Sequence, residues 1–208
     1  STSTPARAGV RQGAAKQIFL LRHAKSSWKD PGLADHDRPL AGRGRRASKL
    51  MARYLRQQGV TPALVICSSA LRARQTLDRV AGSGSPVAAG KVQVERGLYL
   101  ASGEHLLGRL REVRERTASV MLVGHNPGME DLARRLAGGD GVELDRLGAK
   151  FPTGALVVLE LDGRWRELTE GQCRLVAFVT PGDLEHRGGP ALADDPAGGG
   201  RATWPVGP

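Results

Sequence analysis

Short apolar runs alternate with amphipathic stretches along most of the chain. Uninterrupted apolar runs predict buried strands, whereas apolar residues spaced three and four apart predict helices that bury one face. The strands are expected at 17–22, 63–67, 92–94, 119–123, 155–161, 165–168 and 174–179. The helices are expected at 42–58, at 70–81, from Ser102 onward, and from Asn126 to about Ala137.

Capping and turn residues mark several of these boundaries. Ser102 can accept a hydrogen bond from the first turn of the helix that follows it. Asn126 is expected to be the N-cap of its helix, with Pro127 at the first helical position. Asp162-Gly163 is typical of a tight hairpin turn between two strands.

Alternating strands and helices predict an α/β domain. We expect a single three-layer domain over 17–182, in which helices flank a mostly parallel central sheet. The segment 1–16 is rich in Ser, Thr, Ala, Gly and Arg, and 183–208 is rich in Gly and Pro. Both are expected to be flexible tails.

Composition narrows the class of protein. Of the 208 residues, 40% are hydrophobic, enough for a sizeable core, and no run has the roughly 18 apolar residues that a membrane span needs. Cys67 and Cys173 each lie in an apolar run, which indicates buried free thiols in a reducing compartment. We therefore expect a cytoplasmic protein, and the Gly- and Arg-rich composition hints at a bacterial source.

The net charge of +10 favours anionic partners. The helix expected at 42–58 has a strongly basic outer face, which could contact nucleic acid or steer acidic substrates. Only 4% of the residues are aromatic, and none is interleaved with these basic residues to stack on bases. Nucleic acid is therefore disfavoured, and the basic face is interpreted as solvated.

Unusual polar residues follow three of the expected strands. The first strand ends in Arg22-His23, the second leads through Ser68-Ser69 to Arg72, and the strand at 119–123 is followed by His125. Carboxyl ends of parallel strands meet at one edge of a sheet, so two arginines and two histidines should converge there. Such a pocket suits a tetrahedral dianion. Since a neutral imidazole can attack phosphorus, the pattern indicates phosphoryl transfer through a phosphohistidine.

Two other interpretations fit less well. Cysteine phosphatases place five residues between the catalytic Cys and Arg, but only four separate Cys67 from Arg72. Asp35-His36-Asp37 contains metal-ligand side chains, yet three successive residues rarely converge on one ion. We expect neither a metal nor a cofactor.

Three segments resemble a known family. The segments 21–24, 68–76 and 123–127 resemble the three signature segments of the histidine phosphatase superfamily, also called phosphoglycerate mutase-like. Arg-His-Ala-Lys-Ser, Asp37-Arg38-Pro39-Leu40, Leu98-Tyr99 and Gly-His-Asn-Pro-Gly are similar to its small SixA-type branch, the phosphohistidine phosphatases. The resemblance covers about 17–179 and implies the phosphoglycerate mutase-like fold.

The resemblance implies a role for each matching residue. His23 would be the nucleophile, while Arg22, Arg72 and His125 would hold the phosphoryl oxygens without a metal. Arg38, Asn126 and Ser26 would help to bind the substrate. His23 must be neutral at the attacking nitrogen, so its other ring N–H should be held by an acceptor such as a backbone carbonyl.

The general acid is the unsettled part of the resemblance. Ala24 stands where the family's commonest motif has glycine, and the possible acids are Glu95, Asp35 and Asp37. The imidazole of a phosphohistidine leaves more readily than an alkoxide, so an unclear acid favours N–P bonds.

We therefore expect a metal-independent phosphatase acting on phosphohistidine in proteins or on small phosphomonoesters. The alternative is a phosphate- or phosphoprotein-binding module with little turnover. The presence of His23 itself favours the enzyme.

Overall fold

The computed structural model describes residues 15–82 and 85–187. The expected tails, 1–16 and 183–208, lie mostly outside this part of the chain. Where they overlap with it, regular structure extends past both expected boundaries. Strand β1 begins at Lys16, and helix α6 spans Pro181–Arg187.

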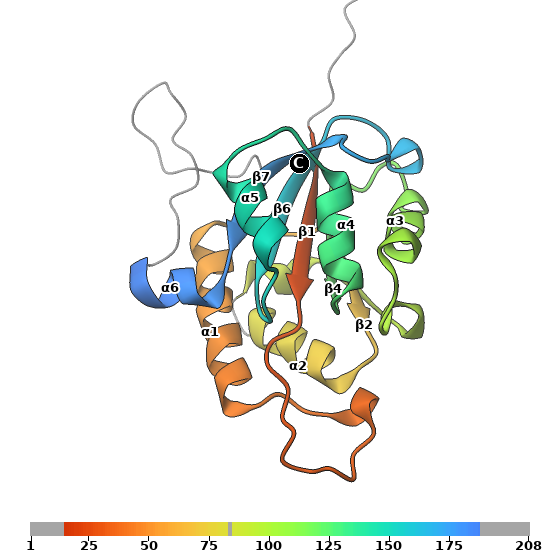
Figure 1. The fold of residues 1–208 in the computed structure, drawn as a ribbon. Coiled ribbons are helices and arrows are strands. Elements are labelled where there is room, and N and C mark those ends of the chain that lie inside the picture. The colour runs from red at the N-terminus through yellow and green to blue at the C-terminus, as the bar shows by residue number, and fades with distance from the viewer. Residues whose placement is uncertain (1–14, 83–84, 188–208) are drawn as a thin grey trace, which may run out of the picture.

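A seven-stranded sheet forms the centre of the molecule (Figure 1). In spatial order its strands are β3 (Lys91–Glu95), β2 (Leu64–Ser68), β4 (Ser119–Gly124), β1 (Lys16–Arg22), β6 (Leu156–Leu161), β7 (Cys173–Val179) and β5 (Ala137–Gly138). Among these described strands, only β6 pairs antiparallel with its neighbours. The mostly parallel α/β sheet is therefore confirmed.

Helices cover both faces of this sheet. The helices are α1 (Gly42–Gln57), α2 (Leu71–Val80), α3 (Gly103–Arg111), α4 (Gly128–Leu136), α5 (Val142–Ala149) and α6. Apolar residues of α1, α2 and α6 pack in one core cluster, and those of α3, α4 and α5 pack in a second. The expected three layers are thus observed.

Strand β1 connects the two clusters. Ile18 and Leu20 belong to the cluster under α3–α5, whereas Phe19 and Leu21 belong to the cluster under α1 and α2. Successive side chains of a strand point to opposite faces, so an uninterrupted apolar run is what a strand buried on both sides requires. Each such side chain contributes roughly 1.5–3 kcal/mol by burial, and this fixes the strand whose end carries Arg22 and His23.

The predicted Asn126 cap is wrong. Helix α4 begins at Gly128, its N-cap position is Pro127, and no side chain caps it. The side-chain amide of Asn126 instead donates hydrogen bonds to the Phe151 carbonyl and to Glu130, each at 3.0 Å. Because the amide is engaged with another loop, the side chain does not act as a local cap. In contrast, Ser102 caps α3 as predicted, by accepting from the His105 N–H.

The predicted strand at 165–168 and the tight Asp162-Gly163 hairpin are also wrong. The segment between β6 and β7 contains a 3₁₀ helix, η4 (Trp165–Glu167). The indole of Trp165 is fully buried and donates to the Thr117 carbonyl at 2.8 Å, and Glu115 accepts from the Trp165 N–H. Anchoring of the indole in the core, rather than pairing with a neighbouring strand, therefore sets the path of this connection.

The apolar pattern left three described elements unpredicted: β5, α5 and α6. Three further 3₁₀ helices are η1 (Asp35–Asp37), η2 (Pro86–Ala89) and η3 (Arg96–Leu98). Across residues 15–82 and 85–187, every helix is too short or too polar to span a bilayer.

Candidate active site

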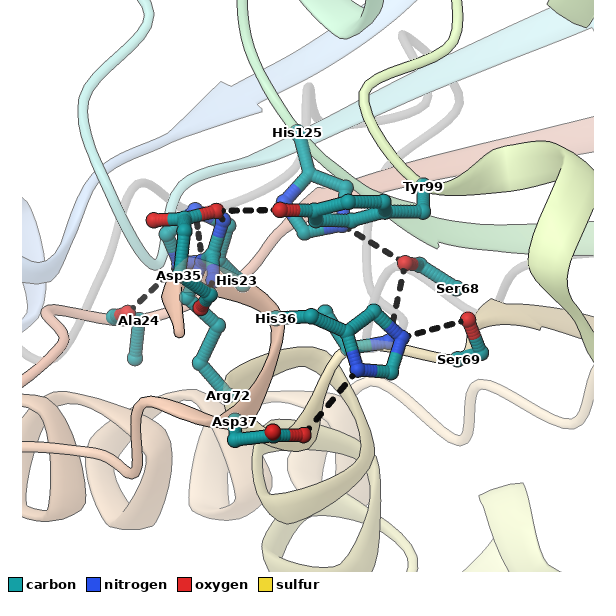
Figure 2. A network of polar contacts seen from close by, with 11 residues as sticks. His23, Ala24, Asp35, His36, Asp37, Ser68, Ser69, Arg72, Tyr99 and His125 are labelled. Carbon is teal, nitrogen blue, oxygen red and sulfur yellow. Dashed lines mark hydrogen bonds and ion pairs between the residues drawn. The ribbon is translucent and has the colours of Figure 1, made fainter. Parts of the chain in front are cut away.

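The three predicted strand ends meet at one edge of the sheet. Arg22, the last residue of β1, is in register with Gly124, the last residue of β4, and the His23 N–H donates to the Gly124 carbonyl at 3.0 Å. His23 and His125 therefore follow paired strand ends, and their ring centroids are 5.0 Å apart. The convergence predicted from the parallel topology is confirmed (Figure 2).

His23 is held in one tautomer. Its Nδ1 lies 2.7 Å from the Ala24 carbonyl oxygen, which can only accept, so Nδ1 carries the hydrogen. The Nε2 lone pair then accepts from Nε of Arg72 at 3.4 Å. Burial lowers the pKa of His23 to about 4, with Arg72 and Arg22 lowering it further against the effect of the Ala24 hydrogen bond. At neutral pH the ring is uncharged, and its Nε2 lone pair faces the Arg72 guanidinium.

His125 is buried beside His23. Its Nε2 is 2.6 Å from the Ser68 hydroxyl at the end of β2, whereas its Nδ1 is buried without a protein partner. Burial and the neighbouring charges of His23 and Arg72 lower the pKa of His125 to about 3. The ring is therefore neutral and has one polar atom left for a ligand.

Arg72 lies in the first turn of α2 and is almost fully buried. It donates to the Asp35 carbonyl at 2.6 Å and to the Asp35 carboxylate at 2.9 Å. The guanidinium is thus held by η1 on one side and His23 on the other. The Asp35 carboxylate therefore occupies part of the Arg72 guanidinium.

Tyr99 belongs to the site but was not predicted as a site residue. Its hydroxyl donates to the Asp35 carboxylate at 2.5 Å, and its ring meets His125 edge-on at 5.5 Å between centroids (Figure 2). The Tyr99 hydrogen bond is the main cause that lowers the pKa of Asp35, followed by Arg72. Burial and Asp35 raise the pKa of Tyr99. The resemblance of Leu98-Tyr99 to the SixA-type branch could have drawn attention to this residue. The sequence alone does not indicate which loop the phenol contacts.

Arg22 and Asn126 share one acceptor. Nη1 of Arg22 donates to the Phe151 carbonyl at 2.8 Å, and the Asn126 amide donates to the same oxygen. Nε of Arg22 and Oδ1 of Asn126 are buried without partners, and desolvation lowers the pKa of Arg22. Both side chains therefore keep an unused polar atom at the strand ends.

Arg38 and Ser26 lie in the loop between β1 and α1. Arg38 stacks on the Trp28 ring at 4.0 Å and donates to the Asp30 carbonyl at 3.1 Å, while its Nε is buried without a partner. Ser26 forms an isolated β-bridge with Leu40. Their contacts thus lie within the loop.

The three candidate acids differ in placement. Asp35 lies between Arg72 and Tyr99, in the site. Glu95 accepts three hydrogen bonds from Arg109 of α3, at 2.8–3.2 Å, and Asp37 is an exposed partner of His36. Of the three, the structure brings only Asp35 into contact with the Arg72 guanidinium.

Unsatisfied polar atoms gather around the site. Six buried side-chain polar atoms in the described part of the chain lack a protein partner, and four belong to Arg22, Arg38, His125 and Asn126. Three of these four side chains, Arg22, His125 and Asn126, stand at the strand ends, where their polar atoms are available to a ligand.

The residues argue against a cysteine nucleophile and show no metal cluster in the described part of the chain. Burial raises the pKa of Cys67 to about 12, and its Sγ donates to the Ser68 carbonyl at 3.3 Å, so this cysteine is a thiol rather than a thiolate nucleophile. Within residues 15–82 and 85–187, no group of three or more His, Cys, Asp or Glu side chains is arranged to hold a metal ion.

Several known proteins are similar to this chain in sequence. The model of the histidine phosphatase superfamily (branch 1) matches residues 18–98. The uncharacterized protein Rv1276c of Mycobacterium tuberculosis is 38% identical over 164 residues, covering 77% of this chain and 99% of the relative. Phosphohistidine phosphatase SixA of Escherichia coli is 30% identical over 152 residues, covering 70% of this chain and 86% of the relative.

A solved structure shares the architecture. It is that of the protein histidine phosphatase SixA complexed with tungstate, which has a TM-score of 0.63 and 26% sequence identity. The match covers 81% of this chain and 99% of that one.

Proposed function

Because the chain belongs to the histidine phosphatase superfamily, in its SixA-like branch, we propose that this phosphatase works without a metal through a covalent phosphohistidine on His23. Its proposed substrates are phosphohistidine in proteins or small phosphomonoesters. The observation that carries the mechanism is the state of His23, whose Nδ1–H is fixed by the Ala24 carbonyl while Nε2 faces Arg72.

In the proposed first step, the Nε2 lone pair of His23 attacks phosphorus. A P–N bond to His23 forms, and the bond from phosphorus to the leaving nitrogen or oxygen breaks with its electron pair. The deprotonated Nε2 and protonated Nδ1 of His23 suit this step, since the Ala24 carbonyl stabilises the charge that grows on the ring.

Arg22, Arg72 and His125 are proposed to hold the phosphoryl oxygens. Each has a polar atom that faces the site or lacks a partner, and preorganised donors of this kind typically contribute about 3–4 kcal/mol each to the transition state. Tungstate is a tetrahedral oxyanion, so the SixA structure that contains it supports such a pocket in this chain.

Asp35 is proposed as the general acid, and the contacts explain how it could obtain a proton. In the free enzyme Tyr99 and Arg72 stabilise its carboxylate and lower its pKa. A dianionic phosphoryl group bound to Arg72 would draw its guanidinium away from Asp35 and would add negative charge near that carboxyl group. Both changes raise a carboxyl pKa, so Asp35 could carry the proton that the leaving group takes.

The second step returns the enzyme to its starting state. Water attacks phosphorus, the P–N bond to His23 breaks, and inorganic phosphate leaves. The Asp35 carboxylate, now ionised, would accept the proton of that water. The same residue thus serves as acid and then base, as reversal of proton transfer in the two half-reactions requires.

The remaining polar side chains are proposed to contact the substrate beyond the phosphoryl group. Asn126 keeps a free Oδ1 next to Arg22, and Arg38, in the same loop as Asp35, has no partner for its Nε among the described residues. Ser26 is proposed as a third substrate contact, from the same loop. A phosphohistidine substrate is supported by the similarity to phosphohistidine phosphatase SixA of E. coli.

The test is rapid-quench labelling in EDTA with a radiolabelled phosphohistidine peptide and, separately, an aryl phosphate. We expect acid-labile, base-stable label on His23 of the wild type and loss of turnover in His23→Ala. The control is His105→Ala, which changes an exposed histidine of α3 and should label normally. The faster substrate indicates N–P or O–P specificity.

Two results of this experiment would contradict the proposal. Label that persists in His23→Ala would refute His23 as the nucleophile. Absence of both label and turnover, with inorganic phosphate still raising the melting temperature, would favour the phosphate-binding module.

A further inference from the structure

Two cationic hollows flank the start of α1. The first, of about 500 Å³, lies between α1, the segment before β6 and the start of α6. The cations that line it are Lys25, Arg43, Arg46 and Lys150, and Glu185 is the one carboxylate among its lining residues. The second, of about 440 Å³, lies on the α2 side and is lined by Lys29, Arg45 and Arg79, without a carboxylate.

These charges are not neutralised by the fold. Helix α1 carries six basic residues and no acidic residue: Arg43, Arg45, Arg46, Lys49, Arg53 and Arg56. In the described part of the chain, none of the seven cations lining the two hollows forms an ion pair. Their positive potential is therefore available to a partner.

The hollows adjoin the segments that hold the active site. Lys25 lies two residues after His23, and its carbonyl accepts from the Ala41 N–H at 2.8 Å, where α1 begins. Helix α1 packs so closely here that a Cβ on Gly44 would lie 2.2 Å from the Lys25 carbonyl oxygen. On the other side, Pro152 and Thr153 line the first hollow directly after Phe151, the acceptor for Arg22.

A phosphoprotein whose phosphoryl group reaches His23 would place the neighbouring part of its surface over this region. We propose that the two hollows form a docking surface for the acidic surface around the phosphorylated residue of a protein substrate. This inference rests on the proposed function and adds the selection of the partner by charge. Unpaired cations at such a surface raise the rate of encounter with an acidic partner, and this rate falls as the salt concentration rises.

The test uses two variants with the same charge change on one helix. Arg43→Glu with Arg46→Glu alters the first hollow, and Arg53→Glu with Arg56→Glu is the matched control. All four arginines are exposed. The pairs are ten residues apart, or about 15 Å along a helix, which exceeds the screening length of about 8 Å at physiological salt.

Three substrates separate docking from chemistry: an aryl phosphate, a phosphohistidine peptide with neutral flanks, and the same peptide with glutamate flanks. For the acidic peptide, we expect Arg43→Glu/Arg46→Glu to lower kcat/KM by about tenfold or more, a difference of 1.4 kcal/mol per factor of ten. The other two substrates, and the control variant with all three, should stay within about twofold of wild type, the range of a surface change.

Binding of a fluorescent decaglutamate peptide is measured in parallel, because it does not depend on turnover. The docking surface is supported if Arg43→Glu/Arg46→Glu weakens peptide binding and the control variant does not. This holds even if no substrate is hydrolysed, because lack of hydrolysis would refute only the proposed function. Equal weakening by both variants, or no binding, would overturn the inference. Tighter binding of a short DNA duplex with the same variant dependence would also overturn it, by indicating nucleic acid.

Discussion

At the scale of single residues, the chemistry of the site depends on which polar atom of each side chain is left to contact a ligand. His23 uses Nδ1 on the Ala24 carbonyl and presents Nε2. His125 uses Nε2 on Ser68, and its Nδ1 has no partner among the described residues. Arg72 faces both His23 and Asp35. These choices follow from neighbours a few ångströms away, and each can be changed by one substitution.

Arg72→Lys should be nearly as inactive as Arg72→Ala. A lysine ammonium cannot form the forked contacts that Arg72 makes with His23 and Asp35, so the charge alone does not restore the clamp. We expect turnover of an aryl phosphate to fall by about 10²–10³ in both variants. Arg74→Lys, on the exposed part of the same helix, is the control. Rescue by Arg72→Lys to within a few fold would contradict the forked geometry.

Tyr99→Phe should raise the pKa of Asp35. The phenol hydrogen bond is the largest of the causes that lower this pKa, and the substitution removes it while keeping the ring beside His125. The pKa is measured by NMR titration of the ¹³C-labelled side-chain carboxyl groups. Tyr54→Phe removes a buried hydroxyl that has no partner among the described residues and should leave Asp35 unchanged. An Asp35 titration identical in Tyr99→Phe and wild type would show that the phenol does not stabilise the carboxylate.

At the scale of elements, close backbone packing positions the segment that carries His23. Helix α1 contacts the chain directly after His23 through Gly44, so Gly44→Ala should displace the Lys25 backbone, lower the melting temperature and reduce kcat. A Cβ at Gly108 of α3 would meet no atom within 4 Å. Gly108→Ala should therefore stabilise the protein by up to about 1 kcal/mol, as expected for a helical glycine.

Thermal unfolding and kcat are measured on both glycine variants. Equal stability of Gly44→Ala and Gly108→Ala would mean that α1 does not need this contact. Loss of stability in Gly44→Ala with normal kcat would mean that the contact supports the fold without positioning His23.

The sequence pattern predicted elements well where one strong signal set them. Strands β1, β2 and β4 and helices α1 and α2 lie within a residue or two of their expected bounds, since buried strands and amphipathic helices have distinct periods. The pattern failed at Trp165 because an aromatic residue can be buried from a 3₁₀ turn as well as from a strand. It failed at Asn126 because the amide binds Phe151, a residue distant in sequence.

At the scale of the whole molecule, the site exists because the parallel topology brings three strand ends together. Arg22, His23, Arg72 and His125 could be predicted because each follows or adjoins a strand that the pattern identifies. The contact of Asp35, rather than Glu95 or Asp37, with Arg72 could not be predicted, since it depends on how the loop before α1 folds over α2. Likewise, Tyr99 enters the site from η3, and only the folded chain shows its contact with Asp35.

Burial of two neutral histidines makes the stability of the whole fold depend on pH. The pKa is about 4 for His23 and about 3 for His125, against about 6.5 in an unfolded chain. Between these values the unfolded state binds more protons, so the free energy of unfolding is highest above pH 6.5 and falls as the pH drops toward 4.

His23→Asn removes one of these groups and also removes a cause of the lowered His125 pKa. The free energy of unfolding of this variant should therefore fall less over this range than that of the wild type, by about 2–3 kcal/mol. Denaturant unfolding at pH 7 and pH 4.5 measures the difference, and His105→Asn, an exposed position, should decline in parallel with the wild type. Parallel curves for His23→Asn and the wild type would show that His23 is not kept neutral by the fold, and the neutral nucleophile on which the proposed first step depends would lose its support.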